Sequence, residues 1–186
     1  MRRLFILTIY LMLVIYALIH LVFFYRDDGM LLSVLSMNAD PMLLMMFNLL
    51  GLFPVAYLLI ALKTMNLTPK DFIPLGLGFM LGGFAITPLF IYKKDHIKPN
   101  KPWVKYASIF GLVGTVLVMI YGLIYGNIQV YLDAFMNDSF IHIMTIDFLF
   151  LVILSVMVLK PVSKFYYLGF IPLIGLYIGV LIHERI

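Results

Sequence analysis

Residues 140–159 read FIHIMTIDFLFLVILSVMVL, a run of twenty residues in which Asp147 is the one charged side chain. A helix of about 20 apolar residues matches the hydrocarbon core of a bilayer, which is roughly 30 Å thick. The segment is therefore predicted to cross a membrane. The whole chain has the same character, because it is 64% hydrophobic and 12% charged, values that exclude an ordinary soluble protein and a disordered one.

Five further segments resemble this one, and the sequence predicts an all-α membrane protein of six transmembrane helices. Little of the 186-residue chain remains for a soluble domain, so residues 1–186 are interpreted as a single transmembrane domain. Two semi-apolar segments, 30–37 and 127–136, are too short to span and are predicted to lie along the membrane surface as short helices. The six predicted spans are 4–24, 42–62, 72–92, 105–125, 140–159 and 165–183.

The sequence also contains weak internal similarity. Residues 36–52 align without gaps on residues 135–151, and two further short matches follow the same order along the chain. We therefore predict a duplication in which repeat one covers about 4–92 and repeat two about 105–183. Because three spans per repeat is an odd number, the second repeat is predicted to be inverted relative to the first, a 3+3 inverted-topology repeat.

Asp147 is the one acidic residue well inside a predicted span. A carboxylate at that depth costs on the order of 3 kcal/mol, so it must face the bundle interior and find a partner or a proton. The alignment places Asn48 opposite Asp147, and the two side chains are expected to meet near the repeat interface. A ligand-, cation- or proton-binding site explains the pair, and so does a polar clasp that only holds helices together.

Three other polar residues within the spans are candidates for ligand or proton binding. His142 and Thr145 share one face of the fifth span, whereas Asp147 lies roughly 140° around the helix from His142. His20 lies near the end of the first span. The two histidines and Asp147 lack the spacing that is typical of a metal centre, so no metal site is predicted and the cofactor stays unknown.

The predicted partner of the chain is the lipid bilayer and not nucleic acid, because the basic residues fall in short loops between apolar spans. Two spans carry glycines four residues apart, a spacing that lets helix backbones approach closely. Contacts with other membrane subunits, or self-association, are predicted through these glycines. They are Gly78, Gly82, Gly175 and Gly179.

The charged residues give contradictory signals about orientation. With six spans and an outside N-terminus, eight of the 13 Lys and Arg residues lie on the cytoplasmic side and five outside. The clearest local contrast is between residues 93–105, with five Lys, and residues 126–139, with two Asp and no basic residue. We therefore predict a protein of the bacterial plasma membrane with both termini outside, although Arg2 and Arg3 argue for the reverse.

Residues 47–54, FNLLGLFP, and residues 140–148, FIHIMTIDF, resemble an uncharacterised family of small polytopic membrane proteins from bacteria and plastids. That family is similar in combining an F-N-x-x-G-x-x-P helix, a Gly-rich helix and a Phe-x-His-x-Met-x-x-Asp-Phe segment. The likeness covers about residues 42–160 and implies no established function. It draws attention to Asn48, His142 and Asp147.

Three functions compete at this stage. A small transporter or ligand-binding protein is favoured, because inverted repeats with polar residues near the midplane are typical of transporters. This hypothesis predicts a polar cavity at the repeat interface that contains both Asn48 and Asp147. The alternative is a structural or assembly subunit, in which Asp147 is buried and satisfied and no cavity exists. An intramembrane lipid-modifying enzyme is less favoured, because it needs two titratable groups that converge on one pocket.

Overall fold

The structure, a computed structural model, describes residues 2–93 and 102–182. All regular elements in these residues are helices, and four of them are long and apolar enough to cross a membrane. These four apolar helices support the prediction of an all-α membrane protein, whereas six spans are not observed. The four are α1 (Arg2–Phe23), α3 (Pro41–Thr64), α6 (Pro102–Tyr125) and α8 (Ser139–Leu159).

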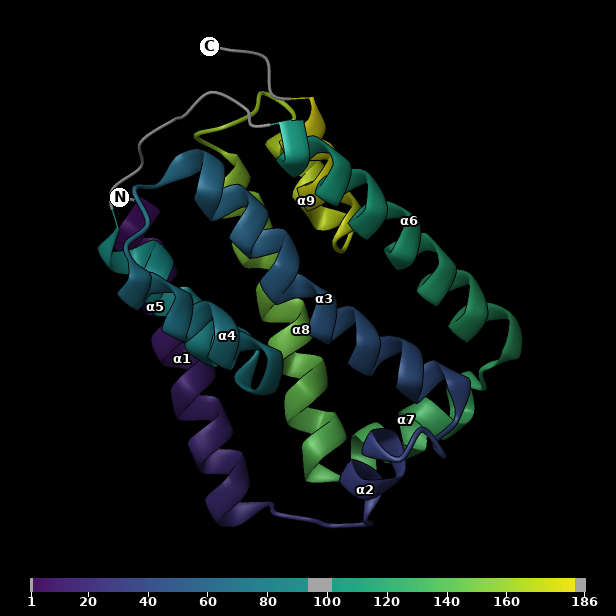
Figure 1. The fold of residues 1–186 in the computed structure, drawn as a ribbon. Coiled ribbons are helices and arrows are strands. Elements are labelled where there is room, and N and C mark those ends of the chain that lie inside the picture. The colour runs from purple at the N-terminus through teal and green to yellow at the C-terminus, as the bar shows by residue number, and fades with distance from the viewer. Residues whose placement is uncertain (1, 94–101, 183–186) are drawn as a thin grey trace.

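The four long helices alternate in direction between two ends of the molecule (Figure 1). We call the end where α1 and α6 begin and α3 and α8 end the upper end, and the opposite one the lower end. The lower end carries two short helices, α2 (Met30–Leu35) and α7 (Ile128–Asn137). Short helices thus form in both segments that were predicted to lie along the membrane surface.

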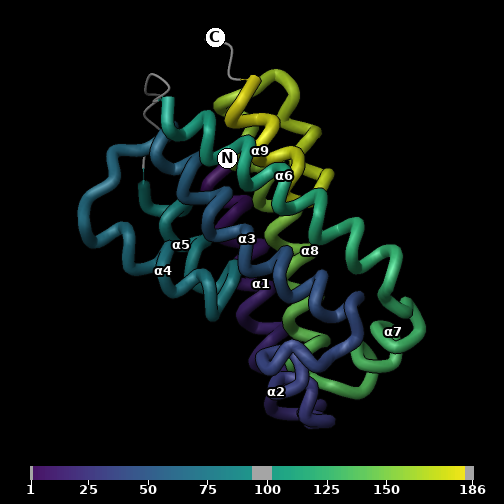
Figure 2. The backbone as a smooth tube through the Cα atoms, turned by 45° about the vertical axis from the view of Figure 1, so that its right-hand side comes forward, coloured from purple at the N-terminus to yellow at the C-terminus, as the bar shows by residue number. Residues whose placement is uncertain are grey.

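The predicted span 72–92 is not a continuous helix. It forms α4 (Phe72–Leu81) and α5 (Gly83–Tyr92), which pack against each other as a hairpin beside α3 (Figure 2). The hydroxyl of Tyr92 donates to Oδ1 of Asp71 over 2.9 Å, so the hairpin returns to the end from which it started. A helix of ten residues rises only about 15 Å, half the thickness of the bilayer core.

The predicted span 165–183, whose last residue lies outside the described residues, is also wrong as one helix. A short 3-10 helix, η2 (Tyr166–Phe170), precedes α9 (Ile174–Leu181), and the two pack together as a second, shorter hairpin. The buried Lys63 at the end of α3 donates from Nζ to the carbonyl of Val180. This contact holds the last turn of α9 at the upper end.

Apart from the 3-10 helix η1 (Pro69–Asp71) before the first hairpin, the two halves of the chain contain corresponding elements in the same order. Each has a long outer helix, a short helix, a long inner helix and a hairpin. Their contacts recur as well: α1 packs on α8 as α6 packs on α3, and α1 packs on α5 as α6 packs on α9. Each half contains two helices that are long and apolar enough to cross a membrane, an even number, and both halves begin at the upper end. The halves are therefore parallel and not inverted, and their residue boundaries stay a prediction.

Two aspartates join the halves reciprocally. Asp40 caps the start of α3 and Asp138 caps the start of α8. Each also accepts a backbone N–H from the other half, since Asn127 donates to Asp40 over 3.0 Å and Asp28 donates to Asp138 over 3.2 Å. Caps of this kind typically contribute about 1 kcal/mol. The matching caps pair Asp40 with Asp138, whereas the sequence alignment pairs Asp40 with Ser139. The two inner helices therefore correspond with a shift of one residue from that alignment.

The inner helices α3 and α8 form the centre of the bundle. More than half of the apolar window of each is buried, whereas α1 and α6 are mostly exposed. Tyr57 of α3 is fully buried, and its hydroxyl donates to the carbonyl of Leu151 over 2.7 Å and lies 3.0 Å from Oγ of Ser155. On the other side of α3, Gly122 of α6 leaves room for Met45. The polar residues of the core therefore tie the two halves together.

The four glycines predicted to mediate association pack inside the chain. A Cβ at any of them would lie within 3 Å of another residue of the same chain. Gly78 of α4 faces Ile86 of α5, and Gly179 of α9 faces Leu159 of α8. Close approach, the property that the spacing predicted, is therefore used inside the hairpins at Gly78 and Gly175, and between the hairpins and α8 at Gly82 and Gly179. Association with other subunits or with a second copy stays a prediction.

An ion pair closes the base of the first hairpin. Nζ of Lys93 lies 2.6 Å from Oδ2 of Asp71, and Thr68 and Tyr92 donate to the same carboxylate. Burial alone would raise the pKa of Asp71, but the hydrogen bonds from Lys93, Thr68 and Tyr92 outweigh it and hold that pKa well below its usual range. A carboxyl with a lowered pKa stabilises the fold above its unfolded-state pKa of about 4. That stabilisation is lost as the pH falls from there through the folded-state pKa.

We expect Asp71→Asn to lower the melting temperature at pH 7 and to remove part of the acid destabilisation of the protein. The reason is that the amide cannot form the ion pair and does not titrate. Thermal melting of the detergent-solubilised protein between pH 7 and pH 3 measures both effects, with the exposed Asp133→Asn as the matched control. Parallel acid responses of wild type and Asp71→Asn would contradict the prediction.

A candidate ligand site at the tip of the first hairpin

Asp147 lies at the centre of the candidate site. It is 2% exposed and lies on α8, roughly 12 Å along the axis from the start of that helix. Both of its carboxylate oxygens accept the backbone N–H of Gly83, over 3.1 and 3.0 Å. Because Gly83 is the first residue of α5, the carboxylate caps the N-terminus of that helix, where the partial positive charge of the helix favours an anion.

The turn at the hairpin tip brings the backbone close to this carboxylate. Gly82 has φ 52° and ψ −129°, a conformation that is open to glycine because glycine lacks a Cβ. A Cβ at Gly82 would lie 1.9 Å from Oδ2 of Asp147. Gly82, which its spacing from Gly78 marked as a helix-packing residue, therefore forms the tight turn that breaks the predicted span.

A cavity of about 700 Å³ lies beside Asp147, between the hairpin tip and the lower end. Its wall includes both Asn48 and Asp147, as the transporter or ligand-binding hypothesis requires. The volume is within the roughly 300–1,000 Å³ that is usual for small-molecule sites. The sequence predicted a polar cavity, but most of the wall is apolar. Apolar lining residues are Leu21, Leu50, Phe79, Phe84, Phe140 and Met144.

Asn48 does not bind Asp147, although both face the cavity. Its Nδ2 donates over 2.8 Å to the carbonyl of Leu44, one turn earlier in α3. The expected contact between the amide and the carboxylate is therefore replaced by a local hydrogen bond. An ionised carboxylate has about four acceptor positions, so Gly83, the one donor to Asp147 among the described residues, does not exhaust them.

The two histidines come together in a separate pocket of about 400 Å³ at the lower end. The rings of His20 and His142 stack with centroids 4.3 Å apart. Nδ1 of His142 lies 2.9 Å from the carbonyl of Phe135, which can only accept, so this nitrogen carries the hydrogen. In the neutral ring Nε2 then accepts from the hydroxyl of Tyr16 over 2.5 Å. Nε2 of His20 lies 3.1 Å from Oγ of Ser139.

The histidine pair brings two titratable groups into one pocket, whereas the enzyme hypothesis needed Asp147 to converge with one of these histidines. His20 and His142 belong to opposite halves of the chain, so no spacing along one helix could reveal the pair. The pocket does not include Asp147, and the described ranges contain no group of three side chains that could hold a metal ion. Thr145 lies elsewhere: it donates to the carbonyl of Ile141 and lies 2.7 Å from the hydroxyl of Tyr131 on α7.

We expect Tyr16→Phe to destabilise the contact between α1 and α8 by about 1 kcal/mol, the usual net value of one hydrogen bond. The phenylalanine keeps the ring but leaves Nε2 of His142 without this donor. Thermal melting in one detergent measures the change, and Tyr121→Phe on the exposed face of α6 is the matched control. A melting temperature for Tyr16→Phe equal to that of wild type would show that the hydrogen bond adds nothing.

No family model, curated protein or solved structure matches this chain. The resemblance of residues 42–160 to the bacterial and plastid family therefore stays a hypothesis.

Proposed function

We propose that this integral membrane protein binds an amphiphilic molecule whose apolar chain fills the cavity and whose head group donates hydrogen bonds to Asp147. One observation carries the proposal. The buried carboxylate of Asp147 lines a mainly apolar cavity between the two halves of the protein. A pocket with apolar walls and one buried polar group matches a ligand that has an apolar body and one polar end.

The carboxylate of Asp147 is the group that would select the ligand. Inside a bilayer the ligand's chain leaves one apolar environment for another, so burial of the chain contributes little to affinity. A protonated amine or a hydroxyl would add charge-assisted hydrogen bonds to the carboxylate in surroundings of low dielectric constant. The amide oxygen of Asn48, in the same wall, is a further acceptor for such a head group.

Binding is better supported than transport. Transport requires access to the ligand from both ends of the protein. The residues that line the cavity lie in the lower half of the protein, so they do not form a path to the upper end. The transporter interpretation therefore stays a prediction of the sequence. A structural or assembly subunit needs Asp147 to be buried and satisfied and predicts that no cavity exists. Asp147 is buried and accepts the N–H of Gly83, but its other acceptor positions stay available beside a cavity of about 700 Å³.

Native mass spectrometry of the full chain with two matched probes tests the proposal. Hexadecylamine donates hydrogen bonds, whereas hexadecyl methyl ether has the same chain and can only accept. We expect wild type to retain the amine about tenfold better, equivalent to about 1.4 kcal/mol. Asp147→Asn keeps an oxygen for Gly83 but offers an NH₂ group to the cavity, so its preference should shift toward the ether. Equal preferences in wild type and Asp147→Asn would contradict a role of Asp147 in ligand binding.

Two glycines provide a test of the cavity itself. Gly51 lines the cavity, and the space where its Cβ would be is open, as it is at Gly114 on α6, which is not among the lining residues. Gly51→Phe should place a ring in the cavity and abolish retention of both probes, whereas Gly114→Phe should bind them as wild type does. Undiminished binding to a folded Gly51→Phe protein would show that the probes bind elsewhere.

A further inference from the structure

We infer that the upper end of the protein binds the anionic head groups of the cytoplasmic leaflet, so that the lower end, with the cavity, faces the opposite side of the membrane. The inference follows from the positions of the charged residues on the observed fold. It does not depend on the ligand proposed for the cavity.

The two ends of the molecule differ sharply in charge. Of the nine Lys and Arg residues in the described part of the chain, eight lie at the upper end. They occupy the starts of α1 and α6, the end of α3 and the turns that follow α3, α5 and α8. Arg26 is the one described basic residue at the lower end, and Asp71 is the one described acid at the upper end. The lower end carries Asp27, Asp28, Asp40, Asp133 and Asp138.

The two hairpins explain why the charged residues contain contradictory signals about orientation. If six segments cross the membrane, the loops before and after 72–92 lie on opposite sides of it, and so do the segments before and after 165–183. This topology places eight basic residues on one side of the membrane and five on the other. A hairpin returns the chain to the side from which it came, so these loops share one side. The count that favoured an outside N-terminus therefore no longer applies.

The charge difference has a direct physical consequence. Lys and Arg in short loops are retained on the cytoplasmic side and attracted by anionic lipids, whereas Asp and Glu have little influence on orientation. Aromatic residues at the upper end agree with a head-group environment. Trp103 and Tyr106 are exposed beside Lys105 at the start of α6, and the ammonium group of Lys160 lies 5.8 Å from the ring of Tyr166.

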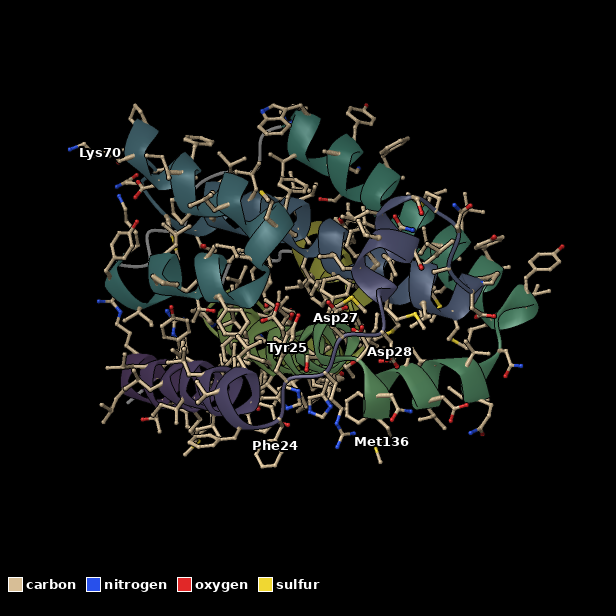
Figure 3. The ribbon with its side chains drawn as sticks, turned by 90° about the horizontal axis from the view of Figure 1, so that it is seen from below. Phe24, Tyr25, Asp27, Asp28, Lys70 and Met136 are labelled. Carbon is tan, nitrogen blue, oxygen red and sulfur yellow. The ribbon has the colours of Figure 1, made fainter. Side chains whose placement is uncertain are left out.

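The lower end also carries exposed aromatic residues, such as Tyr25 and Tyr125, and differs from the upper end in charge. Seen from below, Tyr25, Asp27 and Asp28 are grouped over the middle of the molecule, and Lys70 lies at the left edge of the view (Figure 3). Tyr25 belongs to the cavity wall. The inferred orientation therefore places the cavity in the half of the protein that lies opposite the cytoplasm.

Single cysteine variants test the orientation cleanly, because the natural chain has no cysteine. Asn66→Cys reports on the upper end and Gln129→Cys on the lower end, and both positions are exposed and uncharged. Spheroplasts of bacteria that express the full chain are treated with a membrane-impermeant maleimide before and after permeabilisation. We expect Gln129→Cys to be labelled in both samples and Asn66→Cys only after permeabilisation. Labelling of Asn66→Cys in intact spheroplasts, or protection of Gln129→Cys there, overturns the orientation.

A lipid-binding measurement tests the head-group contact separately. Native mass spectrometry compares retained phosphatidylglycerol, which is anionic, with phosphatidylcholine of the same chains. We expect wild type to retain several times more phosphatidylglycerol, and a double variant with Lys160→Gln and Lys164→Gln to lose most of this preference. Arg26→Gln at the lower end is the control and should keep it. Equal retention of the two lipids by wild type overturns the proposed contact, and neither experiment uses the amine probe that tests the cavity.

Discussion

Gly82→Ala is expected to destabilise the protein by about 3 kcal/mol or more, because two penalties coincide at the hairpin tip. The backbone of Gly82 has a positive φ of 52° with ψ −129°, which an L-residue with a Cβ adopts only under strain. The added methyl group would also lie 1.9 Å from Oδ2 of Asp147. The carboxylate would have to move, and the hydrogen bond to Gly83 would be lost.

Gly76→Ala is the matched control for this substitution. Gly76 lies in the same hairpin, within α4, and no atom lies close to the position of its Cβ. Alanine favours a helix by up to about 1 kcal/mol over glycine, so Gly76→Ala should be neutral or stabilising. Thermal melting and the monodisperse yield from detergent extraction measure both variants. Similar melting temperatures for the two would contradict the tip geometry described here.

Asp147→Ala is expected to cost about 3 kcal/mol, whereas Asp147→Asn should stay within about 1 kcal/mol of wild type. Alanine removes the acceptor for the N–H of Gly83 and leaves this buried donor without a partner at the start of α5. Truncation also enlarges the cavity next to the hairpin tip. Asparagine keeps an oxygen for Gly83 in nearly the same volume.

The difference between the two Asp147 variants separates stability from ligand binding. Thermal melting without added amphiphile measures the structural contribution, in which alanine should be much worse than asparagine. A melting temperature of Asp147→Ala close to that of wild type would show that the capping hydrogen bond does not hold the hairpin. A ligand that binds only the folded state raises the melting temperature. Hexadecylamine should therefore stabilise wild type and have little effect on Asp147→Asn.

The prediction of an unusual role for Asp147 came from local chemistry and is consistent with its position in the fold. A carboxylate inside an apolar span must find a partner, whatever the fold is. The partner itself could not be predicted, because Gly83 contributes a backbone N–H, which every residue other than proline possesses. The histidine pair was missed for a related reason. His20 and His142 stack only because α1 and α8 pack together, and neither helix has a pattern that marks the other as its neighbour.

The sequence by itself determined that the chain is helical and apolar, where the long helices α1, α3, α6 and α8 lie, and that Asp147 needs a partner. These properties follow from composition and from local preferences that act on each segment alone. Only the tertiary structure decided that two of the six apolar segments turn back, that the halves are parallel, and that Asn48 and Asp147 share a cavity. Hydropathy measures the preference of a segment for apolar surroundings, and it is the same whether lipid or protein provides them. The turn at Gly82 depends on a carboxylate 65 residues further along the chain, which no local pattern contains.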